Sequence, residues 1–160
     1  MNIIDFVEFL FLGEVRTKVE RLLHAAEHGS AKAQLKLGVC YLSGRGVEPN
    51  AATAVHWIQM AAAQNHPQAQ FYMGRARFSG DGIPKEYESA YAWFQLASEA
   101  GHRNAMEWRE LLQREMTADE VAEALRFAED LRERICGERS RTMARPLHKR
   151  ILSVLNRREA

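Results

Sequence analysis

The chain has 160 residues, of which 46% are apolar, and its formal charge at neutral pH is +1. This length suits one domain, and the apolar and aromatic content excludes a chain that is disordered throughout. The two cysteines, Cys40 and Cys136, lie far apart, which excludes a disulfide-rich scaffold and favours two reduced thiols over a Cys40–Cys136 disulfide. The charge is uneven: residues 1–131 carry 13 Lys and Arg against 18 Asp and Glu, and residues 132–160 carry 9 against 3. The body is therefore mildly acidic and the tail is basic.

The first segment, residues 1–13, is apolar but lacks the pattern of an export signal. No Lys or Arg precedes Arg16, and Asp5 and Glu8 interrupt the apolar run. The run is also shorter than the ~20 residues that a helix needs to cross a bilayer. We therefore expect residues 2–12 to form a helix of the fold, residues 14–28 to form the next helix, and the protein to be cytoplasmic.

The central part of the chain repeats with a period of 36 residues. Alanine, glycine and tryptophan recur at this spacing: Ala33 with Ala69 and Ala105, Gly38 with Gly74, Gly44 with Gly80, Gly46 with Gly82, and Trp57 with Trp93. A period of this length is typical of stacked helical units. It predicts two full repeats, at about residues 29–64 and 65–100, preceded by a degenerate unit at residues 1–28.

Each repeat is predicted to hold two helices. Gly38 and Gly74 lie inside the first helix, where Gly costs about 1 kcal/mol relative to Ala, so we expect a neighbouring helix to approach closely there. Gly44 and Gly80 suit a left-handed residue that ends this helix. Both positions should therefore have a positive φ.

The second helix follows a tight loop that contains Gly46 in one repeat and Gly82 in the other. Trp57 and Trp93 lie at equivalent positions of this helix, among small residues that permit close packing. We expect both tryptophans to be mostly buried between successive helix pairs.

The C-terminal part departs from the period. Residues 101–136 are predicted to cap the array, with Ala105 in the first helix and a Thr117-x-x-Glu120 capping box that opens the second. Residues 137–145 are predicted to be a polar linker, and Pro146 suits the start of a last helix. This helix, residues 146–157, would be basic and amphipathic, with an apolar stripe of Leu147, Ile151, Val154 and Leu155.

The two repeats resemble Sel1-like repeats, which are relatives of the tetratricopeptide repeat. The shared pattern is A-x-x-x-L/M-G, then G-x-G-V/I, then A-x-x-W, then A-A, and it covers residues 25–105 in two copies. The resemblance implies an all-α, right-handed α/α solenoid that contacts other proteins. We expect the array to occupy residues 1–136, as eight helices in four antiparallel pairs, and the linker and a ninth helix to occupy residues 137–160.

The sequence offers no constellation that indicates catalysis, a metal or a cofactor. His24 and His28 have the i, i+4 spacing of two metal ligands, but a third ligand is not evident. The Gly-x-Gly loops lack the Lys and Ser or Thr of a phosphate-binding loop. We therefore expect no catalytic residues, no metal and no cofactor.

The concave face of such an array is formed by its first helices, and it is the predicted binding surface. The positions of these helices that the core does not need are Lys32, Leu35, Val39, Gln68, Phe71, Arg75 and Phe78. Two alternatives remain for Leu35, Phe71 and Phe78, which either pack against neighbours or line an open groove. An open groove would suit an apolar peptide with an acidic group or a C-terminal carboxylate.

Three classes of function fit these features. The first is a non-catalytic interaction scaffold, as an adaptor, regulator or inhibitor of another bacterial protein. The second is an electrostatic tether, in which the tail binds anionic lipid or nucleic acid. The third is an enzyme with a site in the concave groove.

The end segments add a possible self-contact. Residues 2–12 or 146–157 could pack on their own array or on a second copy and form a homodimer. For residues 146–157 we expect docking on protein. The favoured docking site is the acidic start of the helix that follows Thr117, and the alternative docking site is the concave groove.

Overall fold

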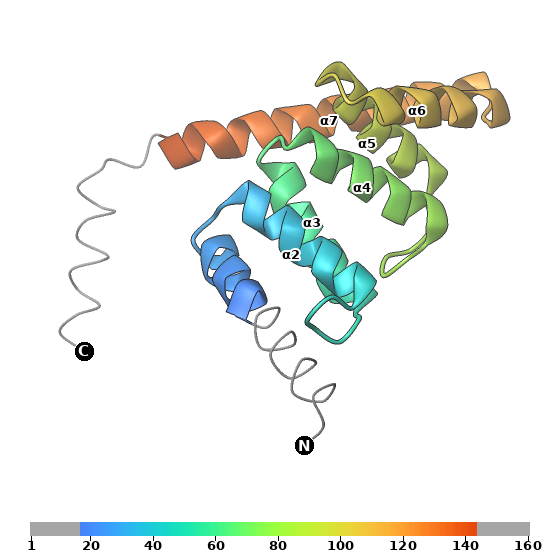
Figure 1. Ribbon diagram of the computed structural model, residues 1–160. Coiled ribbons are helices and arrows are strands. Elements are labelled where there is room, and N and C mark those ends of the chain that lie inside the picture. Colours follow the sequence, from blue (N-terminus) through green and yellow to red (C-terminus); the bar gives the residue numbers. More distant parts are fainter. Residues whose placement is uncertain (1–16, 144–160) are drawn as a thin grey trace.

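The computed structural model describes residues 17–143, and every regular element in that part of the chain is a helix (Figure 1). This confirms the all-α prediction. Residues 17–27 are helical and are followed by α2 (Ala31–Ser43), α3 (Ala51–Ala63), α4 (Pro67–Ser79), α5 (Tyr87–Glu99), α6 (Arg103–Glu115) and α7 (Ala118–Met143). The predicted helices at residues 2–12 and 146–157 lie outside the described residues.

Short-range side-chain bonds cap the starts of α3 and α7. The Oδ1 of Asn50 accepts from the N–H of Thr53 at 2.8 Å, at the start of α3. Before α7, Glu120 N–H donates to the Thr117 hydroxyl at 3.3 Å, and Thr117 N–H donates to the Glu120 carboxylate at 2.7 Å. The predicted capping box is therefore confirmed.

The first helix of each repeat ends at a left-handed glycine, as predicted. Gly44 has φ of 69° and Gly80 has φ of 83°. Asn65, with φ of 61°, takes the same role after α3 that Gly101 takes after α5. Gly44 and Gly80 begin the loops in which the chain turns back, so α2 with α3 and α4 with α5 form two equivalent hairpins.

The glycines inside α2 and α4 permit close approach of the partner helix. A Cβ on Gly38 would lie 2.5 Å from Ile58 Cγ1 and 3.0 Å from the Ala54 carbonyl oxygen. A Cβ on Gly74 would lie 2.5 Å from Phe94 Cε1. The prediction of a close helix–helix approach is therefore confirmed at both positions.

Buried glutamines join the helices at equivalent places. Gln34 donates to the Ala26 carbonyl at 3.0 Å and accepts from Gln64 at 2.8 Å. Gln70, one period later, donates to Asn65 Oδ1 at 2.9 Å. These bonds pair both polar ends of the Gln34 side chain and the amide nitrogen of Gln70, whereas the Gln70 side-chain oxygen is buried without a partner.

The two repeat tryptophans differ in burial. Trp93 is 6% exposed and belongs to a core cluster that includes Ala128, Leu131 and Ile135 of α7. Trp57 is half-buried and packs against the cluster formed by α2 and the helix of residues 17–27. Trp93 is therefore buried as expected, and Trp57 is less buried because the helices that surround the two positions are not the same.

Helix α7 departs from the predicted layout in two ways. It continues through residues 137–143 to Met143, where a polar linker was expected, so the linker prediction is wrong for these residues. It also packs on α5 rather than along α6, so α6 and α7 are not a hairpin like the two repeats. Figure 1 shows α7 passing α5 and extending toward the side of the array where the first repeat lies.

Polar side chains fix α6 and α7 to α5. Arg109 of α6 donates to Gln95 Oε1 at 3.2 Å, and Gln95 donates to Glu99 Oε1 at 2.6 Å. The other oxygen of Glu99 accepts from Arg132 of α7 at 2.5 Å, and Arg132 also contacts Glu129. Helix α5 is therefore the central element of the C-terminal half.

Candidate functional site

The structure divides the seven predicted binding residues into three groups. Lys32, Gln68 and Arg75 are exposed, whereas Val39 and Phe78 are half-buried. Leu35 and Phe71 are 5% and 8% exposed. Leu35 and Phe71 therefore have little surface to offer a partner, and for them the packing alternative holds.

Phe71 is held by the rings around it. Its centroid lies 5.8 Å from that of Phe94 and 4.5 Å from that of His102, which stacks on it. His102 is also the N-cap of α6, where Nδ1 accepts from the N–H of Ala105 at 3.3 Å. Partial burial lowers the pKa of His102 below its usual value.

A cavity opens along α4 on the first-helix side, which is the side of the array formed by α2, α4 and α6. Its volume is about 220 Å³. Its lining is mostly apolar and consists of Leu42, Val55, Ile58, Tyr72, Arg75, Ala76, Phe78, Ser79, Asp81 and Trp108. Of the seven predicted binding residues, Arg75 and Phe78 line this cavity. The other five do not.

Sequence reasoning missed three of the most prominent lining residues, Leu42, Tyr72 and Trp108. Tyr72 and Trp108 are 36 residues apart, so they occupy the same position of successive first helices. In the first repeat, Lys36 occupies this position. Leu42 and Phe78 are related in the same way. The signal that could have revealed the cavity is that large side chains recur at equivalent positions of successive repeats.

Aromatic contacts give the cavity a fixed wall. Phe78 meets Trp108 edge to face, with centroids 5.2 Å apart, and Trp108 lies 5.8 Å from the buried Phe94. Edge-to-face pairs of this kind add about 0.5–1.5 kcal/mol beyond their buried area. The wall is therefore preformed, while Leu42 at the rim is 41% exposed.

Three polar residues lie at the mouth of the cavity. The Ser79 hydroxyl donates to Asp81 Oδ2 at 2.6 Å, and its oxygen is 3.0 Å from the Arg75 carbonyl oxygen. The Arg75 guanidinium lies 5.9 Å from the centroid of the Tyr72 ring. Among the side chains that the structure describes it forms no ion pair, so its charge is open to a ligand.

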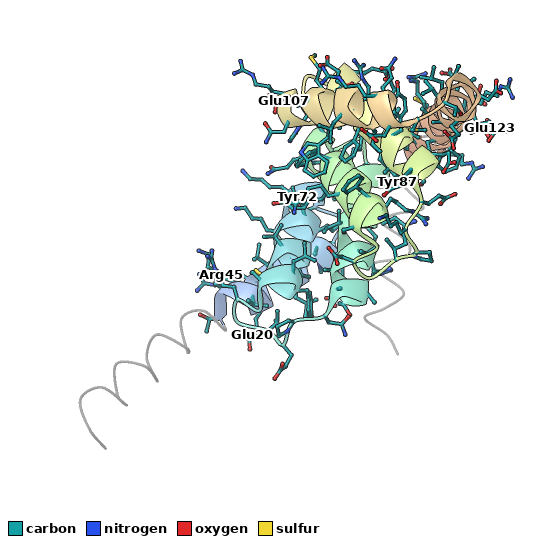
Figure 2. All side chains as sticks on the ribbon, turned by 90° about the vertical axis from the view of Figure 1, so that its right-hand side faces the viewer. Glu20, Arg45, Tyr72, Tyr87, Glu107 and Glu123 are labelled. Carbon is teal, nitrogen blue, oxygen red and sulfur yellow. The ribbon has the colours of Figure 1, made fainter. Side chains whose placement is uncertain are left out.

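The first helices of the two repeats differ in charge from the second helices. Within α2 and α4 the charged residues are all cations: Lys32, Lys36, Arg75 and Arg77. Helix α3 has no charged residue, and α5 has only Glu88 and Glu99. Arg77 is paired with Glu86 at 3.3 Å. The first-helix side of the repeats is therefore the more positive one. Figure 2 shows Tyr72 projecting from this side, away from Glu123.

The groups with shifted pKa values do not gather in the cavity. Burial raises the pKa of Tyr91, against a smaller lowering by Arg109. Hydrogen bonds from Thr117 lower the pKa of Glu120, far along the chain from the cavity lining. Among the described side chains, no three His, Cys, Asp or Glu are grouped to hold a metal ion. His24 and His28 stack on each other with centroids 4.2 Å apart.

The family comparison matches the two hairpins. The model of the Sel1 repeat family matches residues 31–66 and again residues 67–102. The chain carries two Sel1 repeats. Each Sel1 repeat begins at the start of a first helix and ends at the loop after a second one, with the 36-residue period expected from the sequence. Sel1 repeats generally serve as scaffolds for protein interaction.

Two solved structures share this arrangement. One is a protective antigen present in uropathogenic Escherichia coli strains that displays an SLR fold, with 30% identity and a TM-score of 0.71 over 75% of this chain. The other is a Sel1 repeat protein from Oxalobacter formigenes, with 38% identity and a TM-score of 0.58 over 60% of this chain. The solenoid prediction is thereby confirmed.

The matched structures are longer than the part they share with this chain. The chain covers 26% of the Escherichia coli protein and 40% of the Oxalobacter protein. No curated protein matches the chain significantly. Among the described residues, no helix combines the length and the apolar character that crossing a membrane requires.

Proposed function

We propose that this Sel1 repeat protein is a non-catalytic scaffold that binds a segment of another protein through its first-helix side. The observation that carries the proposal is the apolar cavity beside α4, whose aromatic wall is fixed while Leu42 remains exposed at its rim. A partly exposed apolar cavity at the surface is a typical anchor point for a partner side chain. As a scaffold, the protein would act as an adaptor, regulator or inhibitor.

Two further features support this role. The cavity is lined at recurring repeat positions, so a partner that crosses it would contact successive Sel1 repeats. The polar groups at its mouth, Arg75, Ser79 and Asp81, can orient a peptide by hydrogen bonds. The lining is mostly apolar and the groups with shifted pKa values lie outside it, which favours recognition of a peptide over a reaction.

A matched pair of residues allows a sharp test of the surface. Leu42 is 41% exposed and lines the cavity, whereas Leu125 of α7 is 43% exposed and does not. A photo-crosslinking amino acid placed at position 42 should capture a defined polypeptide in the native cell. The same probe at position 125 should not capture it. Mass spectrometry of the crosslinked product identifies the partner and the segment that lies on the surface.

Binding of the purified partner then tests the anchor. Leu42→Ala removes three carbons from the contact and should weaken binding about fivefold by calorimetry, since about 1 kcal/mol corresponds to that factor. Leu125→Ala should leave the dissociation constant unchanged. Equal crosslinking at both positions, or equal weakening by both variants, would show that the first-helix side is not the binding surface.

A further inference from the structure

We infer that the partner segment is acidic, with an apolar anchor residue in the cavity and a carboxylate lying toward the first repeat. This inference rests on the proposed function, because it assigns the chemistry of the partner at the same surface. The observations that carry it are the placement of the unpaired cations and the direction in which charge changes across the Sel1 repeats.

The first-helix side can be followed as rows of equivalent positions. One row runs from Lys36 through Tyr72 to Trp108, and the next from Val39 through Arg75 to Leu111. The cations therefore belong to α2 and α4, while the α6 end of both rows is apolar. Leu111 is 55% exposed at that end.

The cations of this surface are available to a ligand. Lys32, Lys36 and Arg75 are exposed, and none forms an ion pair within the part of the chain that the structure describes. Arg77, by contrast, is neutralised by Glu86 at 3.3 Å. A partner that brings carboxylates to α2 and α4 would therefore gain charge-assisted hydrogen bonds that the protein does not make by itself.

The acids near the surface restrict where the carboxylate can lie. Asp81 lines the cavity and is bonded to the Ser79 hydroxyl at 2.6 Å. Glu107 is exposed on α6, and Figure 2 shows it on the same side as Tyr72. Asp81 follows α4 and Glu107 belongs to α6, so repulsion from these two acids favours a carboxylate that lies toward α2, over Lys36.

The position of the cations relative to the cavity sets the distance, along the partner segment, between its carboxylate and its apolar anchor residue. Neighbouring helices of one layer lie about 10 Å apart, and an extended chain covers about 3.3 Å per residue. A carboxylate that reaches α2 should therefore lie about three residues from the anchor in the cavity. Adjacent acidic residues would strengthen binding through Lys32.

Defined peptides test the charge preference directly. The probes are three fluorescein-labelled peptides with a central leucine flanked by glutamates, by glutamines or by lysines, and their binding to the full chain is followed by fluorescence anisotropy. The glutamate peptide should bind most tightly and the lysine peptide most weakly. Added salt should weaken the glutamate complex most, because screening reduces exposed charge pairs.

Single substitutions locate the charge. Arg75→Gln and Lys36→Gln should each weaken the glutamate peptide by about tenfold, the factor expected for loss of a charge-assisted bond. Arg126→Gln of α7 makes the same change of net charge away from the cavity and should have no effect. Circular dichroism confirms that the variants fold.

The outcomes separate this inference from the proposed function. Equal affinity for the three peptides, or a preference for lysine, overturns the acidic partner even where Leu42→Ala still weakens binding. Failure of every peptide to bind also overturns it. The proposed function itself fails only on the crosslinking and calorimetry of Leu42 and Leu125.

Discussion

Adding a methyl group at Gly74 tests the packing inside a Sel1 repeat. The new Cβ would lie 2.5 Å from Cε1 and 2.6 Å from Cδ1 of Phe94. Phe94 is fully buried, and its ring lies between those of Phe71 and Trp108, so it cannot move aside without disturbing both neighbours. The methyl group must therefore separate α4 from α5.

The expected cost has two opposing parts. Ala is favoured over Gly by about 1 kcal/mol inside a helix, whereas overpacking a filled core costs about 1–3 kcal/mol. Gly74→Ala should therefore lower the free energy of unfolding by up to about 2 kcal/mol. Gly137 provides the control, because it lies within α7 and a Cβ there meets no atom within 4 Å. Gly137→Ala should stabilise by about 1 kcal/mol.

Urea denaturation followed by circular dichroism measures both variants. The difference between them isolates the clash and should be about 1–3 kcal/mol. A double variant, Gly74→Ala with Phe94→Leu, should recover part of the loss, because the smaller side chain makes room for the methyl group. If Gly74→Ala proves as stable as Gly137→Ala, the close contact between α4 and α5 is not what keeps glycine at position 74.

Three further predictions follow from burial, backbone geometry and titration. Trp93→Ala should cost about 3–5 kcal/mol in chemical denaturation, and Trp57→Ala clearly less, because Trp57 is only half-buried; equal losses would contradict the difference in burial. Gly80→Ala should lower stability by about 1 kcal/mol, since φ is 83° there, and an unchanged melting temperature would argue against a strained cap. Burial lowers the pKa of His102, so its neutral ring contributes stability above the unfolded value of about 6.5, and this contribution is lost as the pH falls through the folded pKa. His102→Asn keeps a side-chain cap for Ala105 N–H without titrating, and its stability should depend less on pH between about 7 and 5; identical pH profiles would refute this role.

The sequence by itself determined the features that depend on a few neighbouring residues. The left-handed ends at Gly44 and Gly80, the capping box at Thr117 and the 36-residue period all follow from local preferences of the backbone and of side chains near it. Close packing at Gly38 and Gly74 was also predictable, because a glycine inside a helix costs stability unless a neighbour needs the space. These signals suffice for the Sel1 fold.

The tertiary structure alone decided which side chains of these helices are buried and which neighbours cover them. Trp57 and Trp93 are equivalent in sequence, yet only Trp93 belongs to a cluster that α7 completes. Leu35 and Phe71 look like groove residues because periodicity places them on a face without saying what covers that face. The cavity arises for the same reason, since its walls come from α2, α3, α4 and α6, and their meeting is set by packing across the repeats. Burial is a property of neighbours distant in sequence, and no local pattern specifies them.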